Sequence, residues 1–160
     1  MKYEMRRAKQ RLSPEESLAI LEKGSSGVLA LWDGEEPYAV PLSYVYHQGK
    51  LYFHCARAGR KLAAARTCPK ASFCVVAADH VIPEKYTTAY RSVIVSGRLR
   101  IIEDEAEMVP ALRLLAAKYN PLQGEVLDNK IAEGIPRMFM LELSADEISG
   151  KQGKEFLNQN

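Results

Sequence analysis

The chain has 160 residues, of which 47% are hydrophobic and 26% charged, and this is the length and composition of one ordinary globular domain. Its formal net charge of +2 is too small to indicate a DNA-binding or membrane-binding protein. No apolar run is long enough to span a bilayer, and the basic start MKYEMRRAKQ has no apolar stretch behind it, so we expect no secretory signal and a cytoplasmic protein.

The cysteines and histidines indicate neither a disulfide framework nor a metal site. The cysteines form an odd set without paired spacing: Cys55, Cys68 and Cys74. A zinc site would need a spacing such as CxxC with suitably placed histidines, which is lacking around His47, His54 and His80. We therefore expect reduced cysteines and no metal.

The first expected element is a helix. Ser13 can accept a hydrogen bond from an N-terminal amide, Pro14 suits the first helical position, and Glu16 completes a capping box. The helix should stop at Gly24, so that residues 1–24 form an N-terminal arm and helix.

A run of strands and turns follows. Residues 27–32 form a compact apolar strand, and Asp33-Gly34 is a strong hairpin signal. From Tyr38 to Tyr46 the chain alternates, which predicts a strand with its tyrosines on one face. Further signals predict, in order, a turn at 47–50, a strand at 51–55, a short basic helix from about Gly59 to Thr67, and a strand at 71–77.

The second half of the chain is expected to begin with a loop, because residues 79–90 show no useful periodicity. Residues 91–103 are typical of a long strand with a bulge at Gly97. Asp104 and Glu107 form a second capping pair. A helix ended by Pro121 and a shorter helix at about 125–133 are predicted next, and together they form a helical insertion over 104–134. A last strand at 137–143 and a C-terminal tail over 145–160 follow.

About six strands joined mostly by short connections predict antiparallel pairing. A small barrel is the natural closed form, because it removes the sheet edges and leaves the helices to plug or flank it. No segment alternates strand, helix and strand as a parallel sheet would need. We therefore expect one mainly β domain with flanking helices over residues 1–160.

Pro41 lies inside a convincing strand, where its missing N–H cannot join a hydrogen-bond ladder. This places it at an edge or a bulge and leaves neighbouring peptide groups free. A flat heterocycle such as isoalloxazine needs free backbone donors and acceptors beside an apolar wall. A plain edge-strand proline would give the same pattern.

Three basic residues, Arg57, Arg60 and Lys61, lie just before and within the first turn of the short helix. Cations are unfavourable at a helix N-terminus unless an anion neutralises them, whereas this end suits a phosphate. The cluster is interpreted either as a phosphate site or as a solvated basic face. Neither GxGxxG nor GxxxxGK[ST] occurs, so the two common nucleotide-binding folds are not supported.

His54 shares its strand face with Tyr52 and is followed by Cys55. A strand histidine is either packed and hydrogen-bonded or lies beside a ligand, where it takes part in proton transfer. A Cys–His nucleophile pair is not expected, because adjacent strand residues point to opposite faces. The tyrosines of this region lack a surrounding basic stripe, so no nucleic-acid partner is expected.

Four stretches together carry a resemblance to a known family: PYAVPLSYVYHQGKLYFHCARAGRKL, TCPKASFCV, AYRSVIVSGRLRIIED and ISGKQGKEF. In this order and spacing, the chain resembles the pyridoxamine-5′-phosphate-oxidase-like FMN-binding split-barrel superfamily, and within it the nitroimidazole-reductase-like branch. The resemblance implies a six-stranded antiparallel split β-barrel. It also implies a homodimer with flavin mononucleotide (FMN) in grooves between the two barrels.

The same resemblance implies the residues of the FMN site. Two strand segments would contact the isoalloxazine and ribityl parts: Val40, Pro41, Leu42 and Ser43, and Phe53, His54, Cys55 and Ala56. Arg60 and Lys61 match the basic pair that holds the phosphate. The other subunit would approach the flavin with Tyr90, Arg91 and Ser92. His54 falls where a histidine comes near the flavin in nitroimidazole-reductase-like members.

The implied function is that of an FMN-dependent oxidoreductase. Electrons would pass from a reduced nicotinamide, NAD(P)H, to a small acceptor such as a nitroaromatic or a quinone, with His54 donating a proton. A flavin- or haem-binding protein without turnover, with His54 as axial ligand, and a deazaflavin protein are alternatives. The Arg-x-x-x-Leu-Lys and Arg-Leu-x-Pro motifs of true pyridoxamine phosphate oxidases are absent, which argues against that activity.

Overall fold

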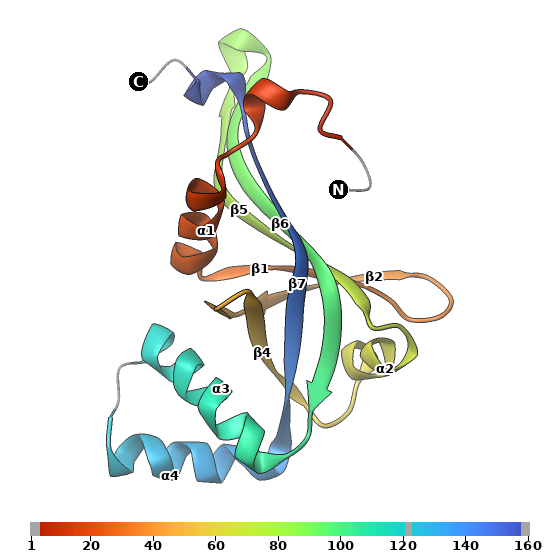
Figure 1. The fold of residues 1–160 in the computed structure, drawn as a ribbon, viewed down its shortest axis with the longest axis vertical. Helices are drawn as coiled ribbons and strands as arrows, with labels where there is room; N and C mark the ends of the chain where they lie inside the picture. The colour runs from red at the N-terminus through yellow and green to blue at the C-terminus, as the bar shows by residue number, and fades with distance from the viewer. Residues whose placement is uncertain (1–3, 121–122, 158–160) are drawn as a thin grey trace.

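A computed structural model describes residues 4–120 and 123–157 and consists of one antiparallel sheet with helices around it (Figure 1). The strand order is β2-β1-β5-β6-β7-β4-β3. The strands are β1 (Ser26–Trp32), β2 (Pro37–Ser43), β3 (Val45–His47), β4 (Lys50–Ala56), β5 (Lys70–Ile82), β6 (Thr87–Ile102) and β7 (Met138–Gln152). The helices are α1 (Pro14–Lys23), α2 (Arg60–Thr67), α3 (Glu105–Tyr119) and α4 (Glu125–Gly134). The mainly β, antiparallel fold is thus confirmed.

A single residue, Tyr44, separates the two edge strands of the sheet. The stretch expected to be one strand changes partner here: β2 pairs with β1, whereas β3 pairs with β4 at the opposite edge. Because one residue joins both edges, the sheet curls into a barrel that stays open between β2 and β4. This change of partner gives seven strands, one more than the sequence indicated.

Inward-facing residues of the long strands fill the barrel. Phe73 lies at its centre, with its ring centroid 4.9 Å from those of both Tyr44 and Phe53. Around them, the buried residues of the interior include Leu21 of α1, Leu29, Val95 and Leu141. A second apolar cluster lies where α3 and α4 pack on the sheet, and its buried members include Met108, Ile131 and Met140.

The two predicted helix caps differ in outcome. At α1 the capping box is confirmed, since the Glu16 N–H donates to Ser13 Oγ (3.1 Å) and the Ser13 N–H donates to Glu16 Oε2 (2.8 Å). At α3 the predicted capping pair is wrong, because Asp104 occupies the N-cap without a side-chain hydrogen bond. The Glu107 carboxylate instead accepts a hydrogen bond from Arg100 Nη1 at 2.7 Å, an ion pair with the sheet that the local pattern does not encode.

The segment 79–90 is not the predicted loop. Strand β5 continues to Ile82, a 3₁₀ turn covers Pro83–Lys85, and β6 begins at Thr87. The two strands form a long hairpin that reaches one end of the molecule (Figure 1). Strand β7 likewise runs past the expected end at Leu143, because residues 145–152 pair with β6.

The predicted bulge at Gly97 is confirmed, since the β6–β7 register shifts between Ser96 and Gly97. A Cβ atom at this position would overlap the carbonyl group of Ser144, so the close approach of the two strands requires glycine. Helix α3 ends at Tyr119, and the predicted breaker Pro121 lies outside the described residues. Among the described residues, no helix has the length and apolarity needed to cross a membrane.

Candidate functional site

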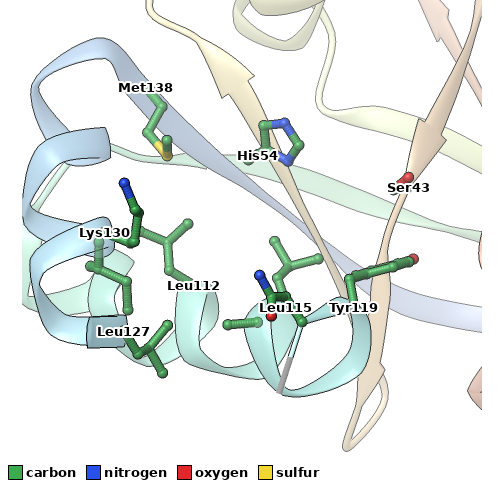
Figure 2. A pocket seen from close by; sticks show the side chains of 11 residues that line it. Ser43, His54, Leu112, Leu115, Tyr119, Leu127, Lys130 and Met138 are labelled. Carbon is green, nitrogen blue, oxygen red and sulfur yellow. The ribbon is translucent and has the colours of Figure 1, made fainter. Parts of the chain in front are cut away.

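A cleft of about 590 Å³ lies between the outer side of β4 and helices α3 and α4 (Figure 2). This volume is within the range of small-molecule sites. Its helix side is mainly apolar, and Figure 2 shows His54 and Ser43 on strands across from it. The lining residues are Ser43, His54, Leu112, Leu115, Ala116, Tyr119, Asn120, Leu127, Lys130, Ile131 and Met138.

Alternation along β4 decides which predicted site residues reach the cleft. Phe53 and Cys55 are buried inside the barrel, whereas His54 and Ala56 are exposed on the outer face. Burial raises the pKa of the Cys55 thiol, and the positive charge of Lys61 opposes this rise. Cys55 and His54 therefore face opposite sides, as the sequence predicted, and do not form a nucleophile pair.

Strand β2 divides its predicted site residues in the same way. Val40 and Leu42 pack against the barrel core, whereas Pro41 and Ser43 are exposed on the outer face. Together with Phe53 and Cys55, the two core-facing residues can contact a ligand beside the strands through their peptide groups.

The gap between β2 and β4 exposes two peptide edges; we call this gap the seam. Within the described residues, β2 pairs only with β1, and β4 has a partner on its β3 side only over residues 50–52. Pro37 and Pro41 are four residues apart, so their backbone groups point to the same side of β2. Since a proline nitrogen cannot donate to the β1 ladder, this side faces the seam. The seam therefore offers the free backbone groups that Pro41 predicted.

The C-terminal end of α3 is fixed to the corner that closes the barrel. The Tyr119 hydroxyl accepts a hydrogen bond from the Tyr44 N–H (3.0 Å), and its own proton faces the carbonyl oxygens of Tyr44 and Ser25. Lys118 Nζ donates to the Gly24 carbonyl at 2.6 Å and lies 4.2 Å from the centre of the Tyr44 ring. Burial lowers the pKa of Lys118. These contacts hold the helix wall of the cleft against the end of β2.

Two of the three predicted basic residues are engaged with the protein itself. Arg57 donates to the Ile135 carbonyl (3.0 Å) and stacks 4.8 Å from the Phe139 ring centre. Arg60 pairs with Asp33 (2.7 Å) and Glu36 of the β1–β2 hairpin. The Glu36 and Glu35 N–H groups, together with Arg60, lower the pKa of Asp33 to about 2. A cation at a helix N-terminus needs an anion to neutralise it. For Arg60, the acidic side chains of the β1–β2 hairpin therefore supply that anion.

Lys61 differs from its two basic neighbours. No ion pair or hydrogen bond holds its ammonium group within the described residues, and its charge acts on Cys55 at the end of β4. Lys61 is therefore the cation of this cluster that is available to an anion in the seam.

Tyr90, Arg91 and Ser92 lie on the half of β6 that is remote from α3 and α4 (Figure 1). Arg91 Nε donates to Gln152 Oε1 at 2.9 Å, and its guanidinium lies 4.4 Å from the Phe156 ring centre. One chain does not bring this segment to the seam. Its predicted approach to the flavin of another subunit stays a prediction.

Sequence reasoning missed the helix side of the cleft. Leu112, Leu115 and Tyr119 recur at the spacing of one helical face, but this pattern does not show that the face is partly open. Lys130 and Met138 gave no signal at all, because only folding brings α4 opposite His54 and the start of β7 beside β4. Among the described residues, no group of three or more histidine, cysteine or acidic side chains is arranged to hold a metal ion.

Comparison with known proteins identifies the family. Residues 13–152 match the family described as pyridoxamine 5′-phosphate oxidase. The chain belongs to this family. No curated protein sequence matches it.

Solved structures share the fold of this family member. A candidate 5-nitroimidazole antibiotic resistance protein from Bacteroides thetaiotaomicron has a TM-score of 0.74 at 19% identity, covering 89% of this chain and 86% of that one. The conserved hypothetical protein Rv2991 of Mycobacterium tuberculosis has a TM-score of 0.83 at 14% identity, covering 98% and 95%. The flavocytochrome Anf3 of Azotobacter vinelandii has a TM-score of 0.76 at 20% identity, covering 99% and 79%.

Proposed function

We propose that this family member binds FMN along the seam and uses it to reduce a small acceptor in the adjoining cleft. The observation that carries the proposal is the seam itself, whose unpaired peptide edges lie beside a mainly apolar cleft that contains His54. A flat ring with polar edges fits this combination, because backbone groups can bond its edges while the cleft shields its face.

Lys61 is proposed to bind the FMN phosphate. It follows β4 at the first turn of α2, whose N-terminal amides add a partial positive charge. Arg60 would contribute beside it, although its contacts with Asp33 and Glu36 already compensate part of its charge.

Lys61→Ala should weaken FMN binding about tenfold or more, as expected for the loss of a charge-assisted contact. Quenching of flavin fluorescence on titration measures this affinity. Lys23→Ala is the matched control, since Lys23 is an exposed lysine on α1, away from the seam. Equal FMN affinities of the two variants would show that Lys61 does not bind the phosphate.

When bound, FMN would supply the redox chemistry, exchanging electrons between a reduced nicotinamide and an acceptor such as a nitroaromatic or a quinone. The chain would position the ring and exclude water from it. His54 is the histidine in the cleft lining, where its imidazole is placed to donate a proton to the reduced acceptor.

His54→Ala should lower the rate of acceptor reduction about 100-fold without a comparable loss of FMN affinity, because general acid catalysis contributes factors of this order. His47→Ala, at the exposed last residue of β3, is the control. Undiminished reduction by the His54 variant would discard the proton-donor role.

The proposed enzyme is a homodimer. Apolar side chains stand exposed on the outer face of β1, β5 and β6, on the opposite side of the sheet from the barrel core: Val28, Trp32, Val76 and Ile94. A second copy seated on this face would bury them and would carry Tyr90, Arg91 and Ser92 towards the seam of its partner. Light scattering should show a dimer that Ile94→Glu dissociates and that Val126→Glu, a change at an equally exposed residue of α4, leaves intact. A monomeric parent protein would reject this arrangement.

A cofactor other than FMN is the second candidate. Neighbours of the same fold include a FAD-binding protein of Mesorhizobium loti and a FAD- and heme-binding protein of Mycobacterium smegmatis, and in this chain His54 is exposed as an axial ligand would be. The absorption spectrum of freshly purified protein separates the two cofactor types, because haem gives a Soret band. Identification of the released chromophore separates FMN from FAD and deazaflavin. The three free cysteines suit the reducing cytoplasm, where we place the enzyme.

A further inference from the structure

The cleft beside His54 contains a lysine that the flavin proposal does not use. Lys130 lines the helix wall from α4, whereas His54 lies on the strand wall across from it (Figure 2). No aspartate or glutamate belongs to the described lining of the cleft. The fixed charge that the cleft presents to a small molecule is therefore positive.

Lys130 interrupts an otherwise apolar face of α4. Leu127 precedes Lys130 by three residues and Ile131 by four, so all three share the side of the helix that lines the cleft. Arg113 of α3 holds this helix through Asp128, with 2.5 Å between Nη2 and Oδ1. The ammonium group thus extends into the cleft from a helix that is fixed to its neighbour.

The partner of this ammonium group is one that a bound molecule can replace. Lys130 Nζ donates to Glu133 Oε2 of the same helix at 3.1 Å, and the two side chains are 66% and 63% exposed. Exposed pairs of this kind contribute little to stability. Glu133 does not belong to the lining, whereas Lys130 does. An anion inside the cleft can therefore take the place of Glu133 at Lys130.

We propose that the acceptor of this cleft is a small aromatic molecule with an anionic group, such as a nitrobenzoate. The ring lies against the apolar helix wall of Leu112 and Leu115, the carboxylate binds Lys130, and the reducible group lies beside His54. Cationic acceptors are disfavoured, because no carboxylate of the described lining can pair with them. This inference rests on the proposed function and adds the substrate class to it.

The reaction balances with the groups already named. Reduction of an aromatic nitro group to a nitroso group takes up two electrons and two protons and releases water. By way of the flavin, the reduced nicotinamide supplies a hydride, which is two electrons and one proton, and His54 supplies the second proton. Lys130 binds the far end of the acceptor and takes no part in this transfer, so its loss should raise KM with little change in kcat.

Calorimetric titration of the FMN-supplied protein, without reduced nicotinamide, tests the cleft apart from turnover. The probes are para-nitrobenzoate, its neutral methyl ester and the cation para-nitrobenzylamine. We expect the benzoate to bind about tenfold more tightly than the ester, and the amine to bind most weakly.

Variants of Lys130 should change this order of affinities. Lys130→Gln should abolish the preference for the benzoate and leave the affinity for the ester within about twofold, and Lys130→Glu should reverse the order of benzoate and amine. In steady-state assays, Lys130→Gln should raise the KM for the benzoate about tenfold and leave kcat within about twofold. Because the side chain is exposed, each variant should fold, and circular dichroism verifies this.

Two carboxylates of α4 supply a matched pair of control variants. Glu133→Gln frees Lys130 from its present partner and should tighten benzoate binding about threefold. Glu125→Gln removes the same charge from the exposed first turn of the helix and should leave benzoate binding unchanged. Equal tightening by both variants would show only general attraction and overturn the proposal. Equal affinities of the parent protein for the benzoate and its ester would overturn it as well.

The proposed function fails on a different result. Protein that does not quench flavin fluorescence, yet prefers the benzoate when titrated as purified, would support the anion site of the cleft and reject the flavin. Protein that binds FMN but does not distinguish the benzoate from the ester would retain the flavin and reject the anionic acceptor.

Discussion

Replacing Tyr119 by phenylalanine tests whether the barrel is closed by a polar contact from α3. The change removes one oxygen atom and leaves the ring in place. That oxygen accepts from the Tyr44 N–H and faces two carbonyl groups, those of Tyr44 and Ser25. It therefore joins the helix to the corner between β2 and β3.

The loss of stability depends on which of these backbone groups can bond to water once the Tyr119 hydroxyl is removed. Tyr44 is fully buried, so its N–H loses its partner and pays the desolvation penalty of an unsatisfied donor, about 1–3 kcal/mol. Ser25 is exposed, and its carbonyl can bond to water instead. Since Lys118 still holds α3 to Gly24, the helix should stay docked. We expect the free energy of unfolding to fall by about 2 kcal/mol.

Urea unfolding followed by the fluorescence of Trp32, the sole tryptophan, measures this loss. Protein concentrations must be equal, because dimerisation would shift the midpoint. Tyr86→Phe is the control, as its hydroxyl is exposed at the hairpin tip and should change stability by less than about 0.5 kcal/mol. If both variants unfold at the same urea concentration, the Tyr119 hydroxyl does not hold this corner.

Two further predictions concern the sheet. Burial would raise the pKa of Glu142, but hydrogen bonds from Arg100 and Lys50 outweigh it and lower the pKa to about 2. Because the folded pKa lies below the ordinary value, this stabilisation is full above about pH 5 and is lost as pH falls towards 2. Glu142→Gln should therefore cost about 2 kcal/mol at pH 7 and much less near pH 3 in urea titrations, and a pH-independent difference would contradict the network. Gly97→Ala should lower the thermal midpoint by several degrees through overlap with Ser144, and an unchanged midpoint would show that the strands can separate there.

The sequence by itself determined the features that depend on residues a few positions apart. The Ser13–Glu16 capping box predicted the start of α1, and alternation placed His54 and Cys55 on opposite faces of one strand. Pro41 predicted an edge with free peptide groups for the same reason, since its missing N–H cannot donate a ladder hydrogen bond on the side to which its nitrogen points, whatever lies there. The linear motifs were sufficient to identify the family.

Tertiary structure decided what depends on partners distant in the chain. Tyr44 ends one pairing and begins another only because β2 and β3 lie at opposite edges of the same sheet. The segment 79–90 lacks periodicity, yet its halves pair with each other and extend the sheet. Arg60 forms an ion pair with Asp33 of the β1–β2 hairpin, and α4 lies across the cleft from His54. Patterns of neighbouring residues cannot encode these outcomes, because each is a contact between two segments that only folding brings together.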